Sequence, residues 1–218
     1  PEDYSYYKKF AELQQEYNFP LSIFSLNYDL CLERSVGNEY IQRGFGVNHS
    51  WKWENLDEDS NIREPIRLYK LHGSIDWEKT DTGDVIESEK VSYEDVAIIF
   101  GTSYKLQYID PFLYLVNVFR KKTLLPNTKG IICVGYSFGD EHINGIISQA
   151  LNNRNDKKII SVAPIEDESK ERERIEKIMG KDIGSNLILV NKKAKNWLIS
   201  VSCNEIESYI GGQNLVLF

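Results

Sequence analysis

The sequence predicts an α/β fold: a doubly wound, mostly parallel sheet of the Rossmann-like type, with helices on both faces. Short apolar runs typical of buried strands alternate with segments whose apolar residues recur at helical spacing. Several of these runs end in a polar or glycine-bearing turn that leads into the next helix. A chain of 218 residues, 41% of them hydrophobic, is long enough to bury one substantial core. We therefore predict a single domain over residues 1–218.

The first half of the chain starts with a helix that Pro20 ends, and strands follow. The predicted helices cover residues 3–17 and 30–36, and the predicted strands cover residues 21–26, 67–71 and 96–100. Residues 37–65 mix Gly, Asn, Trp and acidic residues without sustained periodicity. They form either a long functional loop or a small lobe, and the sequence does not decide between the two.

The second half continues the alternation around a strongly apolar run at residues 130–134, which predicts a central buried strand. Further strands are predicted at residues 158–163 and 186–190, and helices at residues 111–124, 143–151, 167–179 and 194–209.

Composition excludes several classes of protein. The net charge is −7, with 21 acidic and 11 basic side chains through Asp110 and 12 and 15 after it. This balance argues against a broad nucleic-acid surface, which needs clustered Lys and Arg. No run approaches the roughly 18 apolar residues of a membrane-spanning helix, and no signal segment opens the chain. We expect a cytoplasmic protein that binds neither membranes nor nucleic acid directly.

The cysteine and histidine positions predict no metal site. Cys31, Cys133 and Cys203 lie far apart, so neither a disulfide framework nor a zinc ribbon is predicted, and we expect all three to be reduced and buried. His49 and His142 have no partners at metal-ligand spacing and are interpreted as loop or packing residues.

Three polar clusters follow predicted strands: Asn27 with Asp29, then residues 72–74, then residues 135–140. In doubly wound sheets, ligands bind at the carboxyl ends of the strands, so these clusters mark a candidate site. Each also has a structural interpretation, as a helix N-cap, a turn and a glycine loop respectively. Taken singly, each motif is better explained structurally.

Taken together and in this order, the clusters resemble the sirtuin-like family, in particular its bacterial branch associated with antiviral defence. The family pattern is a strand with Asn-x-Asp, then Leu-His-Gly, then Gly-Tyr-Ser-Phe followed by acidic residues. Here it reads Asn27-Tyr28-Asp29, Leu71-His72-Gly73 and Gly135-Tyr136-Ser137-Phe138-Gly139-Asp140. The resemblance spans residues 21–163 and implies a sirtuin-type fold with NAD as the ligand.

The resemblance implies a role for each matched side chain. Asn27 would lie near the nicotinamide ribose and help to place the attacking water, and Asp29 would lie near the nicotinamide amide. His72 would be the general base, because its ordinary pKa of about 6.5 lets imidazole accept a proton near neutral pH. The predicted catalytic residues are therefore Asn27, Asp29 and His72, of which the first two also bind NAD.

Gly135, Tyr136 and Ser137 match the family's second phosphate and ribose loop and are predicted to bind NAD. Glycine lets backbone N–H groups approach phosphate, a hydroxyl adds a hydrogen bond, and the helix start that follows favours negative charge. Asp140 would repel phosphate if it pointed inward, so we expect it to cap the next helix.

Three departures from the family are visible. The first glycine-rich loop has no counterpart, because no glycine precedes Gly37, and we expect an N-terminal strand and loop that this sequence lacks. The four zinc-binding cysteines of the deacetylase sirtuins are absent. Leu26 stands where those enzymes have a glutamine, and leucine cannot hydrogen-bond a ribose. The last two changes favour NAD hydrolysis over deacylation.

These residues predict an NAD glycohydrolase that releases nicotinamide and ADP-ribose, controlled by other domains or subunits. Assembly into a homo-oligomer and formation of cyclic ADP-ribose are left open. The alternative is a non-catalytic module that senses NAD or ADP-ribose within a larger complex. A purely structural domain is disfavoured because Asn27, Asp29 and His72 are all present.

Overall fold

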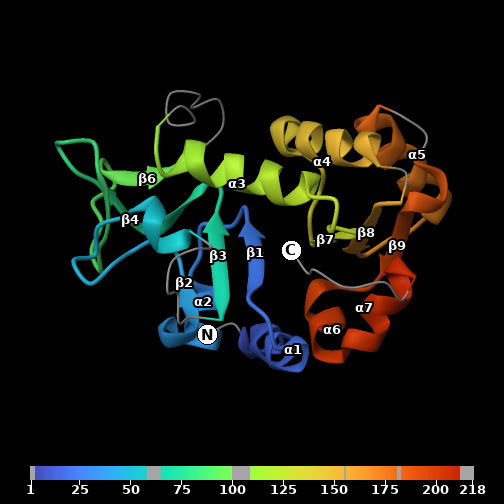
Figure 1. Cartoon of the computed structure of the whole chain (residues 1–218), viewed down its shortest axis with the longest axis horizontal. Helices are drawn as coiled ribbons and strands as arrows, with labels where there is room; N and C mark the ends of the chain where they lie inside the picture. The colour runs from blue at the N-terminus through green and yellow to red at the C-terminus, as the bar shows by residue number, and fades with distance from the viewer. Residues whose placement is uncertain (1–2, 58–64, 100–108, 155, 181–182, 212–218) are drawn as a thin grey trace. The chain divides into compact units, whose positions relative to one another are not determined.

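The structure is a computed structural model that describes residues 3–57, 65–99, 109–154, 156–180 and 183–211 (Figure 1). The chain divides into two compact units, Pro1–Phe119 and Arg120–Phe218, and helix α3 (Phe112–Leu124) runs across the division. Each unit is described by itself. The single domain stays a prediction.

A parallel three-stranded sheet forms the centre of the first unit. Its strands, in the order β1-β3-β2, are β1 (Leu21–Ser25), β3 (Ile66–Lys70) and β2 (Ile41–Gln42). Every residue of the central strand β3 is buried, which explains its short apolar run. The helices before and after β1 are α1 (Lys9–Tyr17), preceded by the 3₁₀ turn η1 (Ser5–Lys8), and α2 (Cys31–Val36). The predicted strands and helices of this region are confirmed.

An antiparallel sheet that the sequence did not predict follows in the same unit. Its strands, in the order β5-β4-β6, are β4 (Gly73–Lys79), β5 (Val85–Glu87) and β6 (Val96–Ile98). The turn expected at residues 72–74 was therefore wrong for Gly73 and Ser74, which begin β4. A Cβ at Gly73, where φ is +84°, would collide with the carbonyl oxygen of Ala97. Glycine is needed here for close approach of β6, not for a turn.

Residues 37–57 add two short 3₁₀ helices and the strand β2 to the first unit. The 3₁₀ helices are η2 (Asn38–Tyr40) and η3 (Trp53–Leu56). The backbone N–H of Trp51 donates to Val85 at 2.9 Å, and Ser50 forms an isolated bridge with Ile86. This part of the chain is thereby attached to β5. Residues 58–64 of the segment predicted as a loop or lobe, and Phe100 of the predicted strand, lie outside the described residues.

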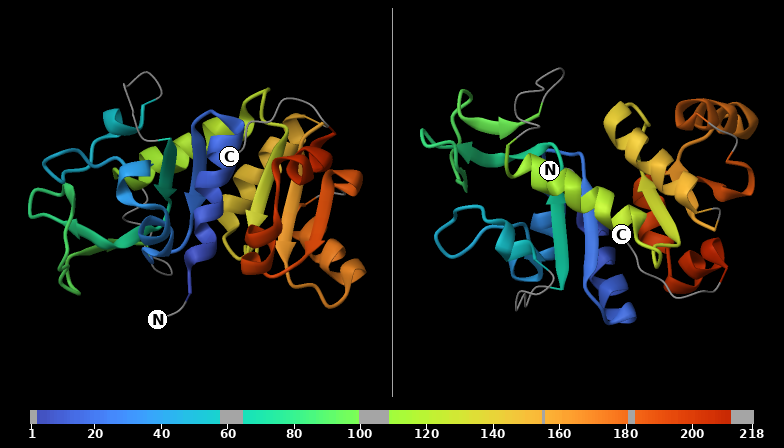
Figure 2. Two further views of the ribbon diagram at one scale, coloured as in Figure 1. Left: turned by 90° about the horizontal axis from the view of Figure 1, so that it is seen from below. Right: turned by 45° about the horizontal axis from the view of Figure 1, so that its top comes forward.

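The second unit contains a second parallel sheet. Its strands, in the order β7-β8-β9, are β7 (Gly130–Val134), β8 (Lys158–Ala163) and β9 (Leu187–Asn191). Its helices after α3 are α4 (Glu141–Asn153), α5 (Glu168–Met179), α6 (Ala194–Ser200) and α7 (Cys203–Ile210). Figure 1 and the right view of Figure 2 show α4 and α5 on one face of the sheet and α6 and α7 on the other. The predicted α/β class with parallel strands is confirmed.

The closing helix predicted over residues 194–209 is two helices. The backbone of Val201 leaves the helical region, with ψ at 142°, and the Ser202 side chain accepts a hydrogen bond from the N–H of Glu205. Ser202 followed three residues later by Glu205 is the sequence signature of a helix start, so the break was present in the sequence.

Lys157 is a charged side chain with no exposed surface in the second unit. Its ammonium donates to three backbone carbonyls, of Thr123 at 2.8 Å, Leu125 at 2.7 Å and Thr128 at 2.9 Å. These carbonyls lie at and just after the end of α3, where helical hydrogen bonding leaves acceptors without donors. The ammonium therefore caps the carboxyl end of this helix.

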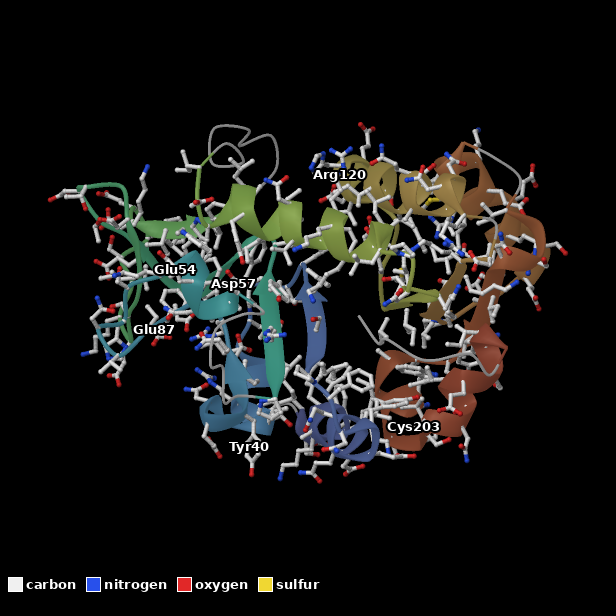
Figure 3. The ribbon with its side chains drawn as sticks, in the orientation of Figure 1. Tyr40, Glu54, Asp57, Glu87, Arg120 and Cys203 are labelled. Carbon is white, nitrogen blue, oxygen red and sulfur yellow. The ribbon has the colours of Figure 1, made fainter. Side chains whose placement is uncertain are left out.

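The three cysteines differ in exposure. Cys133 and Cys203, which is labelled in Figure 3, are buried, whereas Cys31 is partly exposed, so the expectation that all three are buried was wrong for Cys31. Burial raises the pKa of the Cys133 thiol to about 12. Because the thiolate is the reactive form, Cys133 is inert near neutral pH in the folded protein.

We expect the free energy of unfolding of the Lys157→Met variant to be about 2–3 kcal/mol lower than that of the wild type. Buried acceptors without a donor cost roughly 1–3 kcal/mol each, and removal of a buried charge offsets part of that cost. Urea denaturation followed by circular dichroism measures the difference. Lys121→Met is the matched control, because Lys121 lies in the same last turn of α3 but is exposed. Equal denaturation midpoints for the two variants would contradict the capping role.

Modification by an aromatic disulfide reagent at neutral pH tests the thiol assignment. In the native protein we expect fast reaction only at Cys31, and Cys31→Ser should abolish it. Unfolding in guanidinium should expose all three thiols. Peptide mapping identifies the labelled cysteine. Rapid labelling of Cys133 in the native protein would contradict the conclusion that this thiol is buried and unreactive.

Candidate functional site

The register between β1 and β3 determines which polar residues meet in the first unit. Ser25 pairs with Lys70, and the N–H of Leu71 donates to the carbonyl of Ser25 at 2.9 Å. Because the strands are parallel, Asn27 and His72 both come two residues after this last pair, at the same edge of the sheet. Asn27 is exposed and His72 partly exposed, so both side chains are accessible.

Tyr28 lies between Asn27 and Asp29 in the sequence. It connects this polar cluster to the segment around His72. Its ring lies 6.4 Å from the His72 ring, centroid to centroid. Its hydroxyl donates to the carbonyl of Ile99 at 2.6 Å, and the N–H of Ile99 donates to the carbonyl of His72 at 2.8 Å. Burial raises the pKa of Tyr28, which keeps the phenol protonated as a donor. No local sequence pattern indicates this role, because Ile99 is 71 residues away.

The backbone of Tyr28 is held by the start of β4. Its carbonyl accepts hydrogen bonds from the N–H of Ile75 at 3.0 Å and from the hydroxyl of Ser74 at 3.3 Å. Ser74 is fully buried. The His-Gly-Ser motif therefore supplies both a candidate base and an anchor for the Asn-x-Asp turn.

Asp29 lies two residues before helix α2. Its Oδ1 accepts a hydrogen bond from the N–H of Cys31 at 2.9 Å, as in an Asx-turn. Its backbone carbonyl accepts a hydrogen bond from the ammonium of Lys70, the last residue of β3. Asp29 is exposed, and its role toward nicotinamide stays a prediction.

A buried cluster of charges lies behind this turn. Lys70 Nζ lies 3.3 Å from Glu33 Oε1, and Arg43 Nη1 lies 3.4 Å from the same oxygen. Arg43 also contacts Asp76 Oδ2 at 2.9 Å and Glu87 Oε2 at 2.7 Å; Glu87, on β5, is labelled in Figure 3. Burial opposes the charge on Arg43, but the carboxylates of Asp76 and Glu33 outweigh it and raise the pKa of Arg43. The cluster joins α2 and β3 to the segment after β2 and to the antiparallel sheet.

The glycine loop of the second unit follows β7. Gly135 has a φ of +66°, which favours glycine, and its N–H continues the ladder by donating to Val162 at 2.9 Å. The Tyr136 hydroxyl donates to Asn144 Oδ1 at 2.8 Å, and Asn144 Nδ2 donates to the carbonyl of Phe138 at 2.9 Å. Burial, with a smaller effect of a nearby carboxylate, raises the pKa of Tyr136. Tyr136 was predicted to bind NAD, and its hydroxyl thus already has a partner within the protein.

Arg174 on α5 holds the same loop from the other side. Its Nη1 donates to the carbonyl of Ser137 at 3.0 Å, and its guanidinium lies 5.9 Å from the centre of the Phe138 ring. Glu171 accepts two hydrogen bonds from this guanidinium, at 2.8 Å and 2.6 Å. No local pattern links α5 to the loop, because only the folded chain brings Arg174 to Ser137.

The loop leaves Ser137 and Gly139 exposed ahead of helix α4. Asp140 Oδ1 accepts a hydrogen bond from the N–H of Ile143 at 3.0 Å, so the predicted cap is confirmed. An exposed hydroxyl and glycine backbone at a helix start are suited to phosphate oxygens. The six predicted site residues thus lie in two groups, Asn27, Asp29 and His72 in the first unit and Gly135, Tyr136 and Ser137 in the second.

The remaining predictions concern metals and membranes. Among the residues that the structure describes, no group of three or more His, Cys, Asp or Glu side chains is arranged to hold a metal ion. His49 is exposed and its Nδ1 lies 3.0 Å from Glu87 Oε1, while His142 is exposed on α4. No helix in the described ranges is long and apolar enough to cross a membrane.

Comparison with known proteins gives one family match. A family model described as a SIR2-like domain matches residues 21–183, about three quarters of the 218-residue chain. No curated protein matches the chain. The match includes all six predicted site residues and agrees with the parallel α/β architecture, so the predicted sirtuin-like family is confirmed. The chain belongs to the SIR2-like domain family, whose members are generally NAD-dependent enzymes.

Proposed function

We propose that this chain hydrolyses NAD to nicotinamide and ADP-ribose. The observation that carries the proposal is the register of β1 and β3, by which Asn27 and His72 each follow the last strand pair by two residues at the carboxyl edge of the sheet. This edge is where doubly wound sheets bind ligands. An amide and an imidazole there supply a group that orients water and a base that accepts its proton.

The reaction breaks the bond between C1′ of the nicotinamide ribose and the ring nitrogen, which leaves as neutral nicotinamide with the bonding electron pair. The oxygen of water forms the new bond to C1′, and its proton passes to His72 and then to solvent. Asn27 holds the water and the ribose. Asp29, whose Oδ1 accepts a hydrogen bond from the N–H of Cys31, directs its other carboxylate oxygen to the nicotinamide amide.

The loop of the second unit binds the pyrophosphate and a ribose in this proposal. Ser137 and the backbone N–H of Gly139 provide donors, and the start of α4 favours the negative charge. The N–H of Gly135 donates to Val162, so Gly135 contributes the backbone turn that begins the loop. Tyr136 contributes through its ring and through the shape of the loop, because its hydroxyl donates to Asn144.

Two features favour hydrolysis over deacylation. Leu26 is apolar and leaves the ribose without the hydrogen bond that a glutamine would give. The three cysteines lie on α2, β7 and α7, and none forms part of a metal-binding group among the described residues. A zinc lobe for docking an acylated peptide therefore has no ligands in the described part of the chain.

The proposed setting is bacterial antiviral defence in the cytoplasm. Loss of NAD harms the cell that carries the enzyme, so its activity needs control. Further domains, partner subunits or self-assembly would provide that control. This setting is supported by the motif resemblance alone.

Nicotinamide release from NAD by the full-length protein tests the proposal. We expect His72→Ala to lower kcat by about 10²–10⁴-fold, the usual range for loss of a general base. Asn27→Ala should also abolish most turnover, because the attacking water is no longer oriented. Lys177→Ala is the control, since Lys177 is exposed in the last turn of α5 and is not among the residues assigned to the site. Both site variants should keep the wild-type unfolding midpoint.

The alternative function predicts a different result. If the wild type binds NAD or ADP-ribose but releases no nicotinamide in any assembly state, the chain is a sensor module. Retention of full activity in His72→Ala would overturn the assignment of the base while leaving NAD hydrolysis intact.

A further inference from the structure

The Lys70 side chain is almost completely buried at the end of β3, with 2% of its surface exposed. Its ammonium binds the backbone carbonyl of Asp29 and lies 3.3 Å from Glu33 Oε1. Asp29 lies just before α2 and Glu33 lies within it. One cation on β3 therefore holds the segment that leads from the end of β1 into α2 at two points.

Each residue of the Asn-x-Asp turn has its own tether. The N–H of Asn27 donates to Ser25 Oγ at 3.1 Å, which is a local bond within the turn. The carbonyl of Tyr28 is held by the start of β4 through Ile75. The carbonyl of Asp29 is held by Lys70. Of these tethers, the Lys70 contact connects the turn to β3, the strand that leads to His72.

Stability alone does not explain this buried charge. Apolar side chains of similar volume stabilise a protein as well as a buried ion pair does, or better. The second carboxylate oxygen of Glu33, Oε2, is buried without a hydrogen-bond partner among the described residues, although Glu33 is only 4% exposed. A cluster retained for stability would be expected to satisfy both oxygens. The Lys70 ammonium donates the hydrogen bond that fixes the Asp29 carbonyl, and a methyl group could not donate it.

We propose that Lys70 is a positioning residue, which holds the Asp29 carbonyl so that Asn27 and Asp29 keep their places beside His72. Lys70 acts through the backbone and does not touch the reacting atoms. Its catalytic consequence rests on the proposed NAD hydrolysis. Glu33 in turn holds Lys70, and Arg43 holds Glu33, so the segment after β2 takes part in fixing the turn.

The test compares Lys70→Met with the double variant Glu33→Gln/Lys70→Met. In the single variant we expect kcat for nicotinamide release to fall about 10–100-fold with a smaller change in KM, since a misplacement of about 1 Å can cost 10²-fold. In the single variant the Glu33 carboxylate loses its contact with Lys70. The double variant also removes the charge of that carboxylate. We expect it to recover much of the lost unfolding midpoint but to keep the low kcat. Should Lys70→Met not fold, the double variant carries the test.

Arg34→Met is the matched control, because Arg34 is the exposed neighbour of Glu33 on α2 and should change neither kcat nor stability. Amide hydrogen exchange of residues 26–31, read by mass spectrometry, provides a measurement that needs no turnover. Both Lys70 variants should exchange faster there than the wild type, with unchanged exchange in the second unit.

Recovery of wild-type kcat by the double variant would overturn the proposal, because Lys70 would then only neutralise Glu33. Unchanged exchange at residues 26–31 in both Lys70 variants would overturn it as well. Failure of the wild type to release nicotinamide refutes the proposed function instead, and the exchange measurement then decides by itself whether Lys70 positions the turn.

Discussion

The parallel ladder between β1 and β3 is the constraint on which the candidate site of the first unit depends. Its register pairs Ser25 with Lys70, and this last pair sets where Asn27 and His72 follow the two strands. A slip of one residue would turn the buried side chains of β3 toward the opposite face and separate Asn27 from His72 along the strand. The same slip would move the Lys70 ammonium away from the Asp29 carbonyl. Burial of every residue of β3 makes such a slip costly.

Buried ammonium groups solve a related problem in both units. Where a strand or helix ends inside the protein, its last carbonyls have no donor from regular secondary structure. Lys157 supplies that donor at the end of α3, whereas Lys70 donates to the carbonyl of Asp29 in the turn between β1 and α2. Lys157 binds only carbonyls, whereas Lys70 is also paired with Glu33. The first arrangement terminates a helix, and the second also links the turn to a charge cluster that reaches the antiparallel sheet.

The glycine loop of the second unit is supported by residues outside its motif. Asn144 on α4 accepts from the Tyr136 hydroxyl and donates to the carbonyl of Phe138. Arg174 on α5 donates to the carbonyl of Ser137. Asn144 is one turn into α4 and Arg174 lies on α5, so neither carries a pattern that connects it with the loop. A rigid loop of this kind presents its exposed hydroxyl and backbone without the entropic cost of ordering them on binding.

The sequence by itself determined the α/β class, the strands and helices with strong apolar periodicity, the cap at Asp140 and the family. These depend on spacing along the chain, which the sequence displays directly. It also contained the helix start at Ser202, which the continuous periodicity obscured. Only the tertiary structure decided that Gly73 opens a strand against β6, that Tyr28 binds Ile99, and that Lys70 holds Asp29. Those contacts join residues far apart in the sequence, and the packing of strands, not local spacing, selects them.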